Sequence, residues 1–542
     1  EIWKIFTKNE RYHVEPFNVQ EAIRGMRKVN IITAEQAAQL VKDNDTITSI
    51  GFVSSAHPEA LTKALEKRFL ETNTPQNLTY IYAGSQGIRD GRAAEHLAHT
   101  GLLKRAIIGH WQTVPAIGEL AVNNKIEAYN FSQGTLVHWF RALAGHKLGV
   151  FTDIGLETFL DPRQLGGKLN DVTKEDLVKL IEVEGHEQLF YPTFPVQVAF
   201  LRGTYADESG NITMDEEIGP FESISVAQAV HNCGGKVVVQ VKDVVAHGSL
   251  DPRMVKIPGI YVDDVVIAAP EDHQQTYDCQ YDPSLSGEHR APEGAAEEAL
   301  PMSAKKIIGR RGALELTENA VVNLGVGAPE YVASVAGEEG IADTITLTVE
   351  GGAIGGVPQG GVRFGSSRNA DAIIDHTYQF DFYDGGGLDM AYLGLAQCDS
   401  TGNINVSKFG THVAGCGGFP NISQQTKNVF FCGTFTAGGL KVAVEDGKVK
   451  ILKEGKAKKF IKAVDQITFN GSYAARNGKR VLYITERCVF ELTKDGLALI
   501  EVAPGIDIEK DILAHMDFKP IINNPKTMDA RIFQDGPMGL KK

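Results

Sequence analysis

Hydrophobic and polar positions follow one another in units that predict a strand, a glycine turn and a helix. Thr33 and Gln36 are typical of a helix start, because the two side chains can each cap the other's backbone. Residues 46–52 are typical of a strand that runs into a glycine, and Pro58 predicts the first turn of the next helix. Repetition of such units indicates an α/β protein with a largely parallel sheet.

Two patterns recur in the same order in both halves of the chain. Residues 50–60 and 324–333 each combine a strand end, a glycine and a Pro-Glu pair that opens a helix. Residues 203–212 and 394–404 share an Asp-x-x-Gly-Asn turn, although such turns also arise by chance because their residues favour tight turns anywhere. The shared order favours duplication of an α/β domain, which creates a cleft where a ligand can bind.

A change in composition marks the boundary between the two halves. Residues 270–303 are polar, rich in Pro, Asp and Glu, and without periodicity, which fits a linker and an ordered surface connection equally well. We therefore expect an N-terminal domain over residues 26–297 and a C-terminal domain over residues 298–542. Residues 1–25 precede the first clear pattern, which starts at Met26, and we treat them as an N-terminal extension of unknown role.

Composition excludes several classes of protein. The 542 residues carry a formal net charge of −14, which argues against nucleic-acid binding because that requires a basic surface. The chain contains no apolar run of about 18 residues, so we expect no transmembrane helix and no membrane partner. The six cysteines form no CxxC pair, which predicts free thiols in a reducing compartment and a cytoplasmic location.

One strand end carries the main candidate for chemistry. Residues 344–349 alternate as a strand does, and Glu350 follows directly. Four glycines come within the next six residues, namely Gly351, Gly352, Gly355 and Gly356. The carboxyl ends of parallel strands face the ligand crevice, and glycines beside a carboxylate leave room for a bulky reactant. The pattern fits a nucleophilic carboxylate, although an ordinary exposed glutamate at a strand end is the more common case.

A glycine turn over residues 321–330 is a candidate for binding phosphate. It predicts a strand, two glycines and a helix start, whose free N–H groups favour an anion. Gly325 and Gly327 match only part of the dinucleotide fingerprint, because its third glycine position is Glu330. A phosphate loop and an ordinary tight turn are equally supported by this pattern.

Three further segments offer weaker signals. Residues 414–419 form a second glycine cluster whose amides can stabilise an oxyanion, but Cys416 within it has no identifiable histidine base. Gln133 offers a side-chain amide before a glycine, where a packing role is more common, and His110 fits a core histidine with satisfied hydrogen bonds better than a pocket residue. The absence of HExxH, GxxxxGK[ST] and paired CxxC motifs predicts neither a metal site nor a nucleotide triphosphatase.

Taken together, these motifs resemble the family I CoA-transferases. The resemblance is carried by the motifs TVEGGAIGG around Glu350, NLGVGAPE, AGCGGF and YNFSQGT, and by longer runs such as GHWQTVPAIGEL. It extends from Met26 to the C-terminus. It implies two related open-sheet α/β domains, a duplicated CoA-transferase fold, with the active site between them. It also implies a homo-oligomer, a dimer or a tetramer, that takes CoA and acyl-CoA as substrates and holds no permanently bound cofactor.

The resemblance also implies roles for individual residues. The family's active-site glutamate maps onto Glu350, although Gly351 follows it where relatives often have Ser, Thr or Asn. Gln133 and Gly418 map onto the oxyanion donors, with Gly417 as the neighbouring alternative. The implied CoA-binding loop consists of Gly325, Val326 and Gly327.

The implied activity is transfer of CoA between short-chain monocarboxylic acids such as propionate, acetate, lactate and acrylate. It would proceed through an acyl-glutamyl anhydride and a glutamyl-CoA thioester on Glu350, and it needs no ATP or metal because a thioester is conserved. An acyl-CoA thioesterase on the same fold is the nearest alternative, with Glu350 as a base or a leaky nucleophile. A non-catalytic CoA sensor or structural subunit is a third reading, against which the retained glutamate, amide and glycines argue.

Overall fold

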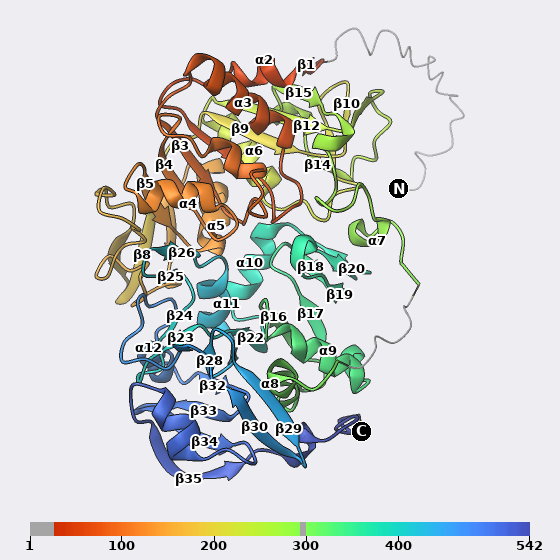
Figure 1. Cartoon of the computed structure of the whole chain (residues 1–542). Coiled ribbons are helices and arrows are strands. Elements are labelled where there is room, and N and C mark those ends of the chain that lie inside the picture. The colour runs from red at the N-terminus through yellow and green to blue at the C-terminus, as the bar shows by residue number, and fades with distance from the viewer. Residues whose placement is uncertain (1–26, 293–299, 542) are drawn as a thin grey trace, which may run out of the picture.

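The computed structural model describes residues 27–292 and 300–541, which fold into two α/β halves, each built on an open sheet (Figure 1). The predicted extension over residues 1–25 lies outside the described residues. None of the described helices combines the length and the apolar character that crossing a membrane requires. The described residues also contain no group of three or more His, Cys, Asp or Glu side chains placed to hold a metal ion.

The N-terminal half is built on an eight-stranded sheet in which all neighbouring strands run parallel. In spatial order the strands are β1 (Asn30–Ile31), β15 (Asp264–Ile267), β12 (Lys236–Val241), β9 (Val198–Arg202), β2 (Thr46–Ser49), β3 (Leu78–Tyr82), β4 (Leu103–Ile108) and β5 (Glu127–Asn130). The strands β9 and β12 are buried along all or nearly all of their length, as expected of a parallel sheet with both faces covered. The predicted parallel sheet is therefore confirmed.

The C-terminal half is built on a ten-stranded sheet whose five central strands are parallel. In spatial order the strands are β21 (Ala372–Ile373), β18 (Ala353–Ile354), β17 (Thr346–Thr348), β16 (Val321–Leu324), β22 (Met390–Gly394), β27 (Asn428–Cys432), β32 (Arg480–Ile484), β33 (Cys488–Thr493), β34 (Gly496–Val502) and β35 (Ile521–Thr527). The strands β18, β21, β33 and β34 join this core in antiparallel fashion.

The two halves share a strand order, which supports duplication. Five parallel strands run β3-β2-β9-β12-β15 in the first half and β17-β16-β22-β27-β32 in the second. The recurring turn also has the same hydrogen bonds in both places. A side-chain oxygen of Asp207 accepts the Asn211 N–H at 3.0 Å, and Asp399 accepts the Asn403 N–H at 3.3 Å. Chance recurrence of turn residues does not explain an identical order of five strands.

The helices begin and end largely where the local signals place them. The predicted capping pair is present, because the Thr33 hydroxyl accepts the Gln36 N–H at 3.2 Å and the Gln36 side chain accepts the Thr33 N–H at 2.9 Å. The helices are α2 (Ala34–Ala38), α3 (Glu59–Thr72), α4 (Pro115–Val122), α5 (Gln133–Ala144), α6 (Ser223–Asn232), α7 (Pro283–Ser286), α8 (Ala304–Ala313), α9 (Glu330–Glu338), α10 (His376–Asp384), α11 (Phe419–Gln425) and α12 (Gly471–Arg476).

The connection between the halves is ordered over residues 270–292, so the linker interpretation is wrong for this part. Leu285 is buried in an apolar cluster with Phe52 and Phe221, and Asp278 pairs with Arg363 at 3.0 Å. Buried side chains and an ion pair to the other half fix the backbone despite its polar composition. The remaining stretch of the predicted linker, residues 293–299, lies outside the described residues.

The halves meet where α5 packs against α10, with α11 beside them (Figure 1). The Cys416 N–H donates to the Asn130 side chain at 2.9 Å, and the Gly134 N–H donates to the Asn421 side chain at 3.2 Å. A Cβ added at Gly134 would lie 2.3 Å from the Asn421 amide nitrogen. The glycine therefore allows the close approach of the two halves that builds the site.

Candidate active site

Glu350 lies in a turn two residues beyond β17, at the carboxyl end of that strand. The strand is shorter than residues 344–349, because Ala342–Thr344 form a turn of 3₁₀-helix. The Thr344 hydroxyl closes this turn by donating to the Ile341 carbonyl at 2.7 Å. A local hydrogen bond therefore outcompetes the β-propensity of Thr344.

Buried side chains from α10 fix the backbone that leads to Glu350. The Gln379 amide donates to the Val349 carbonyl at 3.0 Å, and the Tyr383 hydroxyl donates to the Thr348 hydroxyl at 2.9 Å. All of these groups are buried, so water does not compete for them. The nucleophile candidate is thus held on a rigid support.

Gly351 and Gly352 make room for the protein's own backbone, so the prediction that they make room for a reactant is wrong at these two positions. A Cβ added at Gly352, where φ is +112°, would lie 2.0 Å from the Ile374 carbonyl oxygen. One added at Gly351 would lie 2.9 Å from the Gly365 carbonyl oxygen. These contacts let the chain fold back tightly against itself next to the carboxylate.

Gln133 and Gly418 come from different halves and both lie against Glu350. Gln133 is the first residue of α5 and is buried, and its amide faces the Glu350 carboxylate closely enough to oppose the rise in its pKa. A Cβ added at Gly418 would lie 2.8 Å from Glu350 Oε2. The φ of Gly418 is −82°, which any residue adopts, so the glycine is required here by space alone.

Gly417 and Gly418 differ in whether the backbone N–H donates a hydrogen bond. The Gly417 N–H donates to the Gly109 carbonyl at 2.8 Å. The Gly418 N–H donates to no acceptor within residues 27–292 and 300–541. Among the two candidates for an oxyanion donor, Gly418 is the one whose amide is available beside the carboxylate.

Enclosure by protein changes the acidity of Glu350. Burial raises the pKa of Glu350 to about 7, while the amide of Gln133 acts in the opposite direction. At neutral pH the carboxyl group is therefore balanced between its protonated and ionised forms. Once ionised, a carboxylate with a raised pKa is a stronger nucleophile and base than an ordinary one.

The loop after β16 begins at the same edge of the sheet, because Asn323 pairs with Thr348 across the two parallel strands. The Val326 side chain is 59% exposed, and a Cβ added at Gly327 would meet nothing within 4 Å. The Gly325 N–H donates to the Tyr392 carbonyl at 2.8 Å and is not available to a ligand. The loop is open to solvent beside the carboxylate, as a loop that holds a long ligand must be.

The corresponding loop of the N-terminal half, residues 51–58, is closed. Phe52 is 2% exposed, stacks on Phe221 with ring centroids 5.9 Å apart, and meets the His376 ring at 5.8 Å. Duplication has thus produced one open loop and one loop that forms an aromatic wall of the site.

Sequence reasoning missed His376, which contacts Gln133, and Glu222, which contacts His376. The Gln133 amide nitrogen lies 2.7 Å from Nε2 of His376, and His376 Nδ1 lies 2.7 Å from a carboxylate oxygen of Glu222. Gln133 and His376 lie 243 positions apart in the chain, and His376 and Glu222 lie 154 positions apart, so no local pattern connects them. Only a search for buried Glu, His and Gln side chains in three dimensions finds them.

His110 and Cys416 border the same region. The interpretation of His110 as a satisfied core histidine is wrong, because its Nδ1 is buried without a hydrogen-bond partner among the described residues. Burial lowers the pKa of His110 to about 4, and its ring approaches Gly417. Burial raises the pKa of the Cys416 thiol far above its usual range, which agrees with the expectation that this cysteine is not a nucleophile.

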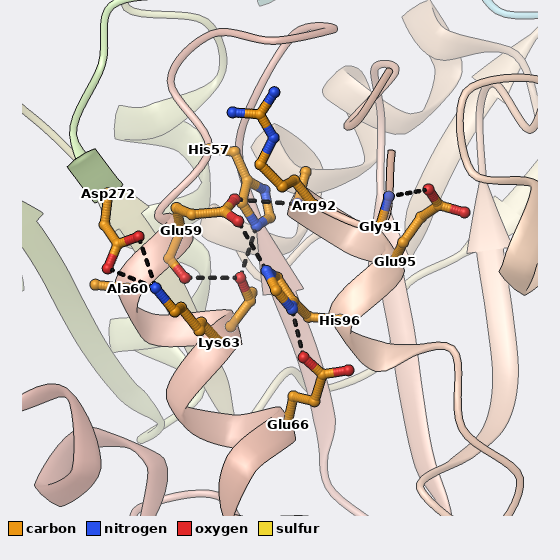
Figure 2. A network of polar contacts seen from close by, with 12 residues as sticks. His57, Glu59, Ala60, Lys63, Glu66, Gly91, Arg92, Glu95, His96 and Asp272 are labelled. Carbon is orange, nitrogen blue, oxygen red and sulfur yellow. Dashed lines mark hydrogen bonds and ion pairs between the residues drawn. The ribbon is translucent and has the colours of Figure 1, made fainter. Parts of the chain in front are cut away.

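A second buried polar cluster lies in the N-terminal half and was not predicted either (Figure 2). Glu59 accepts hydrogen bonds from His96 at 2.7 Å, from the Ala93 N–H at 3.0 Å and from the Tyr277 hydroxyl at 3.0 Å. His96 also contacts Glu66 at 2.5 Å through its other ring nitrogen. Both oxygens of the Glu59 carboxylate are therefore satisfied by protein groups.

Known proteins resemble this chain over most of its length. The family model for Coenzyme A transferase matches residues 31–268. The acetate CoA-transferase YdiF of Escherichia coli K12 is 44% identical over 95% of this chain and 97% of its own length. The caffeate CoA-transferase of Acetobacterium woodii is 46% identical over 94% of this chain and 98% of its own length.

Solved structures agree with these relatives. The crystal structure of the acyl-CoA transferase YdiF apoenzyme from Escherichia coli O157:H7 has a TM-score of 0.90 at 44% identity, covering 95% of this chain and 98% of that one. A structure described as its thioester complex with CoA also has a TM-score of 0.90, at 43% identity. Likeness of this degree in sequence and overall shape shows that the chain belongs to the CoA-transferase family.

Proposed function

We propose that the protein transfers CoA between short-chain monocarboxylic acids and that Glu350 is its nucleophile. CoA-transferase activity follows from family membership, whereas the choice of acids and the covalent route are our proposal. One observation carries it: the Glu350 carboxylate lies beside Gly418, whose N–H is unused among the described residues, and close to the amide of Gln133.

The first half-reaction forms a covalent enzyme intermediate. The Glu350 carboxylate attacks the thioester carbonyl of acyl-CoA, and the resulting oxyanion accepts hydrogen bonds from the Gly418 N–H and Gln133. CoA thiolate leaves, which gives an acyl-glutamyl anhydride. The thiolate then attacks the glutamyl carbonyl, which releases the first acid as a carboxylate and leaves a glutamyl-CoA thioester on Glu350.

The second half-reaction reverses these steps with a new acid. The incoming carboxylate attacks the glutamyl thioester and forms a new anhydride as CoA thiolate leaves. The thiolate returns to the new acyl carbonyl, which releases acyl-CoA and regenerates Glu350. A carboxylate is a weak nucleophile, so precise positioning and one oxyanion donor, worth about 3–4 kcal/mol, must supply much of the rate.

Aromatic rings near Glu350 support a site closed to water. Phe221 approaches Gly351 and Phe380 approaches Gly418, so aromatic rings lie beside both glycines that adjoin Glu350. Such walls exclude water, which would otherwise hydrolyse the anhydride and the enzyme thioester. Acetate and caffeate appear in the names of the relatives, and within this range we propose propionate, acetate, lactate and acrylate, as in propionate CoA-transferase.

The open loop formed by Gly325, Val326 and Gly327 is our candidate for holding CoA. Its exposure beside Glu350 supports this role, because the distant nucleotide part of CoA can supply binding energy that is used at the thioester. We further propose domains over residues 26–297 and 298–542 and a homo-oligomeric assembly, a dimer or a tetramer.

Intact-protein mass spectrometry tests the proposal. After incubation with propionyl-CoA alone, the protein should gain the mass of CoA less one water, and digestion should place the adduct on the peptide that contains Glu350. The Glu350→Ala variant should show no adduct while it keeps the melting temperature of the wild type. An adduct on another residue would contradict the assignment of the nucleophile.

A thioesterase is a second candidate, since a carboxyl group with a pKa near 7 also suits a general base for water. The two functions are separated by adding acetate to propionyl-CoA. A transferase forms acetyl-CoA faster than free CoA accumulates, whereas a thioesterase releases free CoA at a rate that acetate does not change. Failure to form either product would favour a non-catalytic CoA-binding protein.

A further inference from the structure

We infer that Glu222 and His376 are positioning residues that orient the amide of Gln133 toward Glu350, in the order Glu222, His376, Gln133, Glu350. This inference rests on the proposed function, because it assigns work to the oxyanion donor of that reaction. The contact order is given by two hydrogen bonds of 2.7 Å between buried side chains and by the approach of Gln133 to Glu350.

The chemistry of the donors and acceptors fixes the state of the imidazole. The amide nitrogen of Gln133 only donates, so Nε2 of His376 must carry no proton and accept. The Glu222 carboxylate only accepts when ionised, so Nδ1 of His376 must donate to it. One tautomer satisfies both contacts, namely a neutral imidazole with its proton on Nδ1.

That tautomer determines which way the Gln133 amide points. With Nε2 of His376 as the acceptor, the nitrogen end of the amide is held on the side of His376, and its second N–H is left for the reacting centre. A proton on Nε2 would set two donors against each other at 2.7 Å, and the amide would have to rotate. Rotation would turn its oxygen, which repels both a carboxylate and an oxyanion, toward Glu350.

The four residues alternate between the two halves of the chain. Glu222 directly precedes α6 and Gln133 begins α5 in the N-terminal half, whereas His376 begins α10 and Glu350 follows β17 in the C-terminal half. The His376 N–H also donates to the Phe221 carbonyl at 3.1 Å, which aligns the backbone beside Glu222. The arrangement is therefore complete only when the halves are docked.

Glu222 is poorly explained by stability alone. Its side chain is 1% exposed, yet only one of its oxygens has a partner among the described residues, and that partner is His376. A buried carboxylate with an unsatisfied oxygen costs free energy of folding. The preceding residue, Phe221, has a φ of +48°, a strained value for an aromatic residue. Such costs are typical of functional sites.

Aromatic rings protect the central contact from water. The His376 ring lies 5.8 Å from Phe52, 6.1 Å from Phe221 and 5.3 Å from Phe380, measured between ring centroids. His376 itself is fully buried. Water is thus kept from replacing Gln133 as the donor to Nε2, and the orientation of the amide does not depend on solvent.

The sharpest test replaces Glu222 with Gln, which keeps its shape but allows an N–H to face Nδ1 of His376. When that N–H faces Nδ1, the proton moves to Nε2 and the Gln133 amide loses its orientation. We expect kcat for CoA transfer from propionyl-CoA to acetate to fall about 10- to 100-fold with KM changed less than about twofold. Single-turnover formation of the Glu350 thioester should slow by the same factor.

Three companion variants separate positioning from folding. Glu59→Gln alters a buried, histidine-bonded carboxylate away from the site, so it should lower the melting temperature and leave kcat unchanged. Glu222→Asp keeps the acceptor and should restore part of kcat. In a His376→Gln background, adding Glu222→Gln should change kcat less than about twofold, because Glu222 acts only through the imidazole.

Nitrogen NMR of the wild-type enzyme labelled with ¹⁵N-histidine reads the tautomer in the unaltered site, and the spectrum of the His376→Gln variant assigns the signal. We expect a His376 ring protonated on Nδ1 alone. A ring protonated on Nε2, or on both nitrogens, would overturn the inference. So would a Glu222→Gln enzyme that keeps wild-type kcat while the same NMR experiment shows its His376 proton on Nε2. In either case the proposed function stands as long as the wild-type enzyme forms the thioester on Glu350. If the wild-type enzyme forms no such thioester, the proposed function is rejected instead.

Discussion

Two carboxylates of this protein stand in similar places and behave in opposite ways. Glu59 opens the helix that follows β2, and Glu350 follows β17, so both lie at the carboxyl edge of a parallel sheet with a histidine nearby. Although burial opposes it, the hydrogen bond from His96 lowers the pKa of Glu59 to about 2. Burial raises the pKa of Glu350 to about 7.

The difference lies in how many protein groups satisfy each carboxylate. Glu59 receives hydrogen bonds directly from a histidine, a backbone N–H and a tyrosine hydroxyl. Figure 2 shows the contact between Glu59 and His96. The histidine near Glu350 is instead bonded to Gln133 and Glu222, and the Gly418 N–H donates to no described residue. A carboxylate whose partners are complete stabilises the fold, whereas one with unused donors around it is ready for a reacting group.

The largest contrast is expected in activity. Glu350→Gln should reduce CoA transfer by at least about 10³-fold, because the amide cannot form the anhydride or the thioester. Glu59→Gln should leave kcat within about twofold of the wild type, since its partners lie outside the site. Steady-state assays with propionyl-CoA and acetate measure both. Loss of activity in the Glu59 variant with unchanged stability would break the comparison.

An intermediate effect is expected from filling the space beside Glu350. Gly418→Ala places a methyl group 2.8 Å from Oε2 of Glu350 and should lower kcat about 10- to 100-fold. Gly394→Ala is the matched control, because a Cβ there meets nothing within 4 Å. Rates and melting temperatures of the two variants should be compared. Equal kcat in both would show that the carboxylate can move aside, contrary to a fixed nucleophile.

The smallest contrast is expected in stability, and its sign differs between the two carboxylates. Because the pKa of Glu350 is raised from 4.5 to about 7 in the folded state, stability is lost as pH rises from 4.5 through about 7, and the loss is constant at higher pH. Glu350→Gln should therefore stabilise the protein by about 1–2 kcal/mol at pH 8 and not at pH 4. The lowered pKa of Glu59 contributes stability above pH 4.5 that is lost as pH falls toward 2.

Urea unfolding at a series of pH values checks this prediction. Glu59→Gln should destabilise the protein by about 2–3 kcal/mol at pH 7, with a smaller difference under more acidic conditions. If the free energy of unfolding changed with pH in the same way in both variants, that result would contradict the opposite pKa shifts of Glu350 and Glu59.

Much of the architecture could be predicted because its signals are local. The capping pair of Thr33 and Gln36, the recurring Asp-x-x-Gly-Asn turn and the strand–glycine–helix units predict a duplicated parallel α/β fold. The family motifs also named Glu350, Gln133 and Gly418, which the structure brings together, although their catalytic roles remain predictions.

Other features escaped prediction because they depend on distant partners. The glycines after Glu350 are required by the carbonyls of Gly365 and Ile374, and residues 270–292 are ordered by buried contacts that their polar composition does not reveal. His110 was misjudged because hydrogen-bond satisfaction depends on neighbours that no local pattern specifies.

The amino-acid sequence by itself determined the fold class, the duplication and the residue types at the reacting centre, since these depend on periodicity and on short motifs. Only the tertiary structure decided which amide is unused, which carboxylate is satisfied and how Glu222 and His376 reach Gln133. The physical reason is that hydrogen bonds and burial depend on which side chains meet when the two halves pack, and those side chains lie far apart along the chain.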